Sequence, residues 1–557
     1  MRSGAKRRTL FVLLAAIVTG MSSAGAFFAH ASAQGQTAVE HHALWVHPPA
    51  VGRTPEAVKA FVDQCRRANI DTLLVLVKGM NGEIYWPSKR FPEAVVKGYD
   101  SFDMLGELTK DAHPYGIKVH AWFVDFAEGV NSPAVRQHPE WAELNPAGGT
   151  TATETLGPRH RPYPYVWMCP ARRPGYVDQW LLPMMEEVAR TFAVDGIHHD
   201  YVRYPGDVAP DSYCFCDYCL AHIPRYALLE YESRASTRYH VDPRQERIEA
   251  NWWTDPTMLP ATYSAADRRE RADFLLNGRT IPGGPPDMRF FFYDYRVQQI
   301  DEFVREVHAM VKRVNPKLET SASVFKNPVQ SGRFIGQQWH RWDGSMDFFT
   351  PMTYRSHFAG SFDDYLAHLE ETTRRQIEWT GHRHPIEAGI ASTYLYREEL
   401  QPFDDMNDAL DSLRDLPNAA DAEAARRQLN TAIYVLDGAS GDPRAAQQVA
   451  MKKLVDANAR LQTRLAPLAP GPAKALADLV AAAEHATAEQ LPAAVNAVST
   501  ELAKIRADLP PGFCPPEKLI RSIEAARRAR PDGIAIFAAS SVTQEKLWPA
   551  LEKAFAR

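Results

Sequence analysis

The residues most able to do chemistry lie in the run DGIHHDYVRYP at residues 195–205, where an apolar stretch ends in charged side chains. Because side chains alternate along a strand, His198 and Asp200 share one face, and Asp200 stands where the strand ends. A carboxylate next to Arg203 is expected to stay ionised, and it could act as a nucleophile or stabilise a developing cation. The alternative is that Asp200 and Arg203 form an ion pair that only fixes the loop.

A second group of chemistry-bearing residues is the run Cys214–Cys219, which reads CFCDYC and holds three thiols within six residues. These thiols could bind Zn²⁺ with a fourth ligand such as His222, or they could pair as disulfides in an oxidising compartment. We favour disulfides or inert structural thiols and predict no metal site. Cys65 and Cys169 are expected to be buried single thiols.

The elements that must position these residues are short apolar runs alternating with amphipathic stretches from residue 40 onward, which is typical of βα units and a parallel sheet. Eight strands are predicted, at Ala43–Val46, Thr72–Val77, Ile117–Phe123, Gly196–His199, Leu318–Val324, Met346–Met352, Ile386–Ile390 and Ile534–Ala538. An open doubly wound sheet would need a Gly-rich phosphate loop after the first strand, where His47 and two prolines stand instead. The pattern therefore predicts an α/β fold, a closed (β/α)8 TIM barrel.

Residues 401–515 interrupt this alternation with an Ala- and Leu-rich segment. Helical periodicity runs through Ala422–Val435, Pro443–Leu465, Ala473–His485 and Leu491–Leu509. We predict an all-α bundle inserted between strands seven and eight, with the barrel at 34–400 and its completion at 516–557. The bundle has no clustered His or Cys, so we expect it to shield the barrel or bind a partner.

The first 33 residues have the features of a secretory signal. Four basic residues precede the apolar run Leu10–Val18, and Ala31-Ser32-Ala33 supplies a small-residue cleavage site. The apolar run is shorter than the ~20 residues of a membrane-spanning helix, so no integral membrane association is expected. We expect export to the periplasm or the medium, with the Sec and twin-arginine routes both open.

The composition is that of an ordinary folded protein. With 557 residues, 45% of them hydrophobic and 24% charged, the chain is neither disordered nor a multi-span membrane protein. The formal net charge is -5, without a long basic run beyond the N-terminus, so binding of nucleic acid is not expected. We see no P-loop, HExxH or GxSxG motif and predict no cofactor. The oligomeric state stays open.

Four segments together resemble the family 10 glycosyl-hydrolase-like proteins, exported barrel proteins related to the amylase-type clan. These segments are residues 82–89, 112–122, 195–205 and 349–354, and the likeness extends over residues 40–395 and 516–557 but not over the helical insertion. The resemblance implies cleavage of glycosidic bonds in a polysaccharide or a peptidoglycan glycan. It also implies that Asp200, at the end of strand four, is the nucleophile. The family's glutamate at the end of strand five is absent, since residues 321–327 read SASVFKN.

Hydrolysis of a glycosidic bond requires two carboxyl groups, so Asp200 needs a partner. Asp125, where strand three ends, is the first candidate for the proton donor, followed by Glu128 and Glu83. A donor would need a pKa raised by burial against aromatic rings such as Trp122. The alternative function is a noncatalytic glycan-binding barrel that has lost its acid.

Sugar rings have apolar faces, so a saccharide cleft is expected to contain aromatic side chains beside polar ones that bind hydroxyls. The predicted substrate-binding residues are Trp45, His47, Lys78, Trp86, Trp122, His198, Tyr201, Arg203, Tyr354 and Arg355. Each could instead belong to the core. The expected ligand is a carbohydrate polymer or an oligosaccharide.

Overall fold

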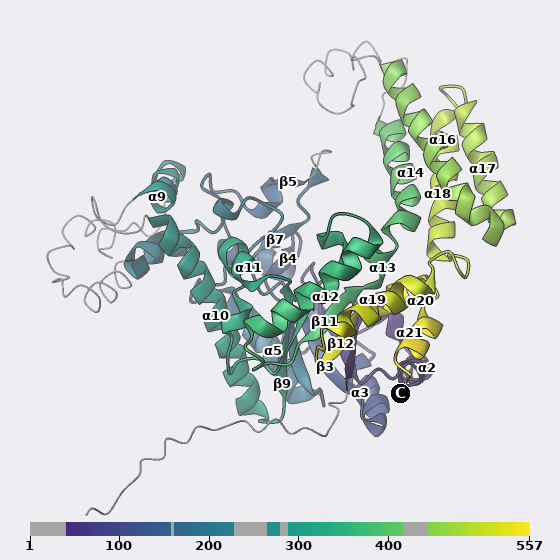
Figure 1. Cartoon of the computed structure of the whole chain (residues 1–557). Coiled ribbons are helices and arrows are strands. Elements are labelled where there is room, and N and C mark those ends of the chain that lie inside the picture. Colours follow the sequence, from purple (N-terminus) through teal and green to yellow (C-terminus); the bar gives the residue numbers. More distant parts are fainter. Residues whose placement is uncertain (1–39, 157–160, 228–263, 279–287, 416–442, 557) are drawn as a thin grey trace, which may run out of the picture. The chain divides into compact units, whose positions relative to one another are not determined.

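The computed structural model describes residues 40–156, 161–227, 264–278, 288–415 and 443–556. Eight parallel strands close into a barrel in the order β1-β12-β11-β10-β9-β8-β3-β2 (Figure 1). They are β1 His41–Val46, β2 Thr72–Lys78, β3 Lys118–Val124, β8 Gly196–Asp200, β9 Glu319–Phe325, β10 Phe348–Met352, β11 Glu387–Ala391 and β12 Gly533–Phe537. The predicted barrel and all eight strands are confirmed, with bounds that differ by at most two residues. The expected signal at residues 1–33 lies outside the described residues.

Helices surround the barrel because the strands are buried and their outer faces need cover. In β2, for example, all seven residues are buried. The helices are α1 Pro48–Val51, α2 Pro55–Arg67, α3 Met104–Ala112, α4 Pro133–Gln137, α5 Leu182–Thr191, α9 Ala265–Asn277, α10 Met288–Val314, α11 Pro328–Ile335, α12 Phe362–Trp379, α13 Ser392–Leu395, α19 Pro516–Arg528, α20 Ala539–Gln544 and α21 Trp548–Ala554. Thr54 caps α2, accepting a hydrogen bond from the Ala57 amide.

Where the structure describes it, the connection between β3 and β8 contains four short strands. Strand β4 (Ala127–Gly129) pairs antiparallel with β7 (Tyr165–Trp167), and β5 (Thr155–Leu156) pairs with β6 (Arg161–Pro162). The β4–β7 ribbon folds the long connection back onto the carboxyl end of β3. It therefore brings a distant segment next to the strand exits, where barrel enzymes carry their active sites.

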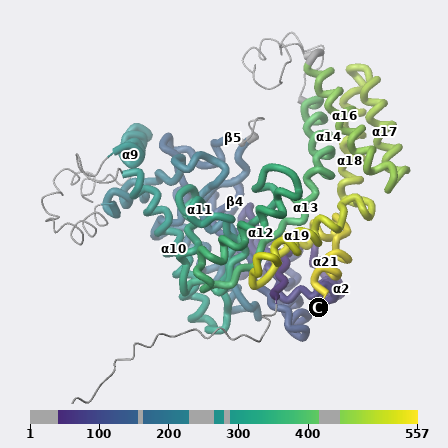
Figure 2. Tube along the Cα trace, in the orientation of Figure 1, coloured from purple at the N-terminus to yellow at the C-terminus, as the bar shows by residue number. Residues whose placement is uncertain are grey.

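The all-α insertion between β11 and β12 is confirmed. Its helices are α14 Arg397–Asp415, α16 Pro443–Leu468, α17 Pro470–Glu484 and α18 Leu491–Ala507. Each packs on its neighbours in the cycle α14, α16, α17, α18, as the tube trace shows (Figure 2). The expected boundary at 401 falls inside α14, because Glu398 in its first turn is bound by Arg355 and Lys518 of the barrel. The predicted helix Ala422–Val435 lies outside the described residues.

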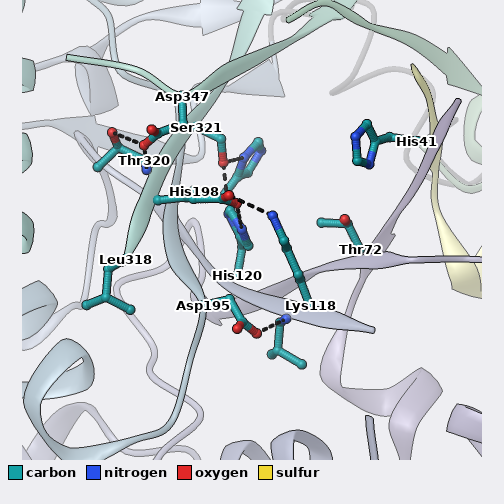
Figure 3. Close-up of polar contacts among 12 residues, drawn as sticks. His41, Thr72, Lys118, His120, Asp195, His198, Leu318, Thr320, Ser321 and Asp347 are labelled. Carbon is teal, nitrogen blue, oxygen red and sulfur yellow. Dashed lines mark hydrogen bonds and ion pairs between the residues drawn. The ribbon is translucent and has the colours of Figure 1, made fainter. Parts of the chain in front are cut away.

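The barrel interior holds both apolar and polar side chains. Trp45, Leu74, Trp122 and Phe348 belong to a buried inner cluster. Beside it, the Ser321 hydroxyl lies between the Nδ1 atoms of His120 and His198, at 3.2 and 2.9 Å (Figure 3). None of the helices in the described ranges has the length and apolar character needed to cross a bilayer.

Candidate active site

Asp200 is the last residue of β8 and lies at the mouth of the barrel, 7% exposed. Its Oδ1 accepts a hydrogen bond of 2.8 Å from the backbone N–H of Tyr201. Tyr201 has φ of 53°, in the left-handed region that non-glycine residues rarely occupy. Such backbone strain concentrates at functional sites.

Burial raises the pKa of the Asp200 carboxyl to about 7. The Tyr201 amide, Arg203 and the Trp122 indole lower this pKa, and nearby Asp125 raises it. The attraction of Arg203 therefore does not keep the pKa of Asp200 at its usual value, because the loss of hydration outweighs that attraction. A carboxyl group with this pKa is partly protonated at neutral pH, which suits a proton donor.

The Arg203 guanidinium has other partners than Asp200. It lies over the rings of Tyr201 and Trp167, 4.6 and 4.8 Å from their centroids, and donates to the Tyr204 carbonyl at 3.0 Å. The ion pairs among the described residues do not include one between Asp200 and Arg203. Arg203 therefore supports the loop after β8 by cation–π and backbone contacts.

Aromatic side chains frame the Asp200 carboxyl. The half-buried His47 ring lies edge-on to Trp122 at 5.2 Å and to Phe537 at 5.8 Å, and Tyr354 lies 5.9 Å from Phe537. Burial and the nearby Asp200 carboxylate raise the pKa of Tyr354, so its phenol stays protonated. Of the predicted substrate-binding residues, the mouth thus brings together His47, Trp122, Tyr201 and Tyr354. Phe537 was missed, although its place at the end of β12 is a signal.

Asp125, the first candidate for the donor, is fully buried. Its Oδ2 lies 2.8 Å from Nδ1 of His199, which is also fully buried and faces Phe303 of α10. Burial raises the Asp125 pKa, and His199 and Lys78 lower it. The structure places Asp125 on the helix side of the barrel wall, away from any substrate in the mouth.

Glu128 is also fully buried, in an ion pair with Lys78 at 3.1 Å. Its Oε1 accepts a further hydrogen bond of 2.6 Å from the Tyr176 hydroxyl. The Lys78 ammonium donates to the carbonyls of Val124 and Ala127, at 2.7 and 3.2 Å. The pair ties the end of β2 to the connection after β3 and is closed to ligands.

Glu83 is the predicted carboxylate that stays half-buried at the rim. It accepts hydrogen bonds from the Asn81 amide at 2.8 Å and from the Tyr85 hydroxyl at 3.3 Å, and the Tyr85 ring packs on the inner cluster. A Cβ on Gly79 would lie 2.2 Å from the Glu83 carboxylate, so glycine there leaves the room this group occupies. Glu83 is thus a partly exposed carboxylate in the loop after β2.

The other predicted substrate-binding residues are structural. The Trp45 indole donates to His198 at 3.3 Å inside the barrel, and burial lowers the pKa of His198 well below its usual value. Trp86 is buried against Phe123 and donates to Glu187. Arg355 is fully buried and binds Glu398 at 2.7 Å. The alternation of side chains along a strand predicts that these residues lie near strand ends, but it does not show how deeply each side chain is buried.

A cavity of about 250 Å³ adjoins the mouth where β9 and β10 end. Its lining residues are Gly206, Phe325, Lys326, Asn327, Gln330, Ser331, Phe334, Ile335 and His357. Arg203 lies 5.2 Å from the Phe325 ring, so the cavity is next to the loop that follows Asp200. Its lining is carboxylate-free, which agrees with the missing glutamate at the end of strand five.

The cysteines after β8 are closer to a fourth thiol than the sequence suggested. The Sγ atoms of Cys169, Cys214, Cys216 and Cys219 all lie within 4.8 Å of one another, and all four residues are buried. The interpretation of Cys169 as a single thiol is therefore wrong, whereas Cys65 is buried as expected. The exposed His222 is not the fourth member, because the group consists of four cysteines; its Nδ1–H donates to the Tyr218 carbonyl at 2.8 Å.

Comparison with known proteins gives a partial match. A family model described as hypothetical glycosyl hydrolase 6 matches residues 57–201, which end at Tyr201 beside Asp200. The match supports the broader expectation, a similarity to glycosyl hydrolases, and does not specify family 10 or the amylase clan.

Curated relatives are distant. The S-layer-related protein of Niallia circulans is 23% identical over 397 residues, covering 64% of this chain and 22% of that protein. The glycosyl hydrolase DigH of Escherichia coli K12 is 27% identical over 173 residues, covering 28% of this chain and 37% of that protein. The chain thus spans well under half the length of these relatives.

The solved structures to which this chain is similar are also distant in sequence. The glycoside hydrolase domain of PgaB (BpsB) from Bordetella bronchiseptica has a TM-score of 0.39 at 15% identity, covering 65% of this chain and 90% of that chain. The β-galactosidase from Marinomonas ef1 has a TM-score of 0.41 at 14% identity, covering 63% and 48%.

Proposed function

We propose that this protein is an exported glycoside hydrolase that cleaves a carbohydrate polymer or oligosaccharide at the carboxyl end of its barrel. The observation that carries the proposal is Asp200, a buried carboxyl group with a pKa of about 7 among the rings of the mouth. Glycosidases hold one carboxylic acid in this state to protonate the leaving oxygen. The match of residues 57–201 to a glycosyl hydrolase family supports the same class.

In the proposed reaction the protonated Asp200 donates its proton to the glycosidic oxygen as the bond to the anomeric carbon breaks. This role replaces that of nucleophile, which would need an ionised group. The second carboxylate is Glu83, which acts on the anomeric carbon directly or removes a proton from the attacking water. The half-buried His47, Tyr201 and Phe537 rings offer their surface to the sugar, and the Tyr201 amide holds the Asp200 carboxyl in place.

Glu83 is favoured over Asp125 and Glu128 because a reacting carboxylate must contact the substrate. Glu83 is half-buried, whereas Asp125 and Glu128 are fully buried. Asp125 and Glu128 are paired with the buried His199 and Lys78.

The alternative is a noncatalytic glycan-binding barrel that uses the same aromatic mouth. Release of reducing ends from a panel of polysaccharides and peptidoglycan separates the two functions. We expect Asp200→Asn and Glu83→Gln to lose turnover, and the exposed Glu489→Gln to keep it. Saccharide binding without turnover in the wild-type protein would favour the alternative.

A further inference from the structure

The four buried cysteines come from two separate loops at the carboxyl end of the barrel. Cys169 follows β7, whose ribbon with β4 continues the connection after β3. Cys214, Cys216 and Cys219 follow β8, in the same loop as Arg203. The two loops are also joined by the backbone, since the Phe215 amide donates to the Leu144 carbonyl at 2.7 Å.

The spacing of the sulfur atoms fits a metal ion better than covalent bonds. Cys169 Sγ lies 3.6 Å from Cys219 Sγ and 3.7 Å from Cys216 Sγ. Four sulfurs placed tetrahedrally at ~2.3 Å from a zinc ion lie about 3.8 Å from one another. A disulfide bond needs a separation of about 2.05 Å.

The surroundings suit negatively charged sulfur. The Cys216 amide points at Cys214 Sγ at 3.5 Å, a donor aimed at a thiolate. The Arg296 guanidinium is 2% exposed and lies 4.3 Å from the centroid of Tyr204, a ring that borders Cys169 and Cys219. A Zn²⁺ ion with four thiolates carries a net charge of about -2, and a buried cation nearby lowers the cost of holding that charge.

We propose that Cys169, Cys214, Cys216 and Cys219 bind one structural Zn²⁺ ion. Metal binding displaces the four thiol protons and leaves no open coordination position, so the ion does no catalysis. The ion cross-links the connection after β3 to the loop after β8. It thereby fixes the base of the loop that follows Asp200. The proposal does not depend on the glycoside hydrolase function, because its readouts are metal content and thiol state.

Elemental analysis of the purified full-length protein tests the proposal. We expect about one zinc per chain after dialysis against metal-free buffer. Cys219→Ser and Cys169→Ser should lose most of this zinc and melt at a lower temperature. Cys65→Ser is the matched control, a buried cysteine on α2, and should keep the zinc. Cobalt-loaded wild-type protein should show the intense visible absorption of a tetrahedral thiolate complex.

Thiol counting on the wild-type protein gives a result even if the variants fail to fold. All six cysteines should react in denaturant with chelator present, and fewer without the chelator. Two disulfides in place of the metal would leave two reactive thiols and show as a mass deficit in the unreduced protein. That result, or less than a tenth of a zinc per chain in folded wild-type protein, would overturn the proposal.

Discussion

Asp125 and His199 form a side-chain pair at 2.8 Å in which both residues are fully buried. They stand at the carboxyl ends of β3 and β8, where the Asp125 amide also donates to the Asp200 carbonyl at 2.8 Å. The pair and the backbone bond hold the two strand ends together directly behind the proposed acid. Asp125 is therefore a positioning residue for Asp200 rather than a group that meets substrate.

Asp125→Ala should reduce the free energy of unfolding by about 3 kcal/mol, because it leaves His199 buried without its partner. Urea denaturation measures the loss. The exposed Glu489→Gln should change stability by less than about 0.5 kcal/mol. A stable Asp125→Ala protein without activity would instead return Asp125 to the catalytic group.

Asp200→Asn should lower kcat by about 10²–10⁴-fold, the usual contribution of a general acid. Its melting temperature should stay at or above that of the wild type, because an amide removes the cost of a buried carboxylate. The measurement is turnover of the best substrate beside a thermal melt. Full activity in the folded variant would rule Asp200 out as the donor.

The pH profile of kcat/KM should fall as the pH rises through about 7, since the donor must be protonated and its pKa is raised to about 7 by burial. A nucleophilic Asp200 would produce the opposite limb, with activity rising through that pH. The pH profiles of wild type and Asp200→Glu distinguish a proton donor from a nucleophile. If the limb near pH 7 belongs to the carboxyl group at position 200, it should shift when that group is substituted.

Glu387 makes the stability of the barrel depend on pH. Burial, Asp71 and Glu319 raise its pKa to about 8, and His41 and Lys118 lower it. Because this folded-state pKa lies above the unfolded value of 4.5, the folded protein binds more protons and loses stability as pH rises from about 4.5 to about 8. Glu387→Gln should therefore melt higher than wild type at pH 9 but not at pH 4. If wild type and Glu387→Gln differ in melting temperature by the same amount at pH 4 and pH 9, this prediction is wrong.

The helical insertion should be dispensable for folding of the barrel. The ring centroids of Phe403 and Phe513 lie 5.8 Å apart, so a short Gly/Ser linker can replace residues 404–512 at little entropic cost. This cut keeps the Lys518–Glu398 contact and loses the pair between Lys546 and the exposed Asp508, which is worth little. We expect a soluble protein that unfolds cooperatively by circular dichroism. Aggregation would mean that the bundle covers apolar barrel surface.

The barrel strands and the carboxyl group at position 200 are local properties, which is why they could be predicted. Periodicity over five to seven residues specifies a strand, and the end of a parallel strand specifies which barrel face its last side chain meets. Local pattern also separated the helical insertion from the barrel, although α14 begins before residue 401 because Glu398 is held by Arg355 and Lys518.

Burial and long-range proximity depend on which segments pack together, and neither is encoded locally. In the sequence, Asp125 and Glu83 are both carboxylates near strand ends. In the structure Asp125 is buried beneath α10, whereas Glu83 is partly exposed. The ionisation of Asp200 follows from the surrounding packing, which outweighs its neighbour Arg203. Cys169 lies 45 residues before Cys214 in the chain. It reaches the other three thiols only because the β4–β7 ribbon folds back at the barrel mouth.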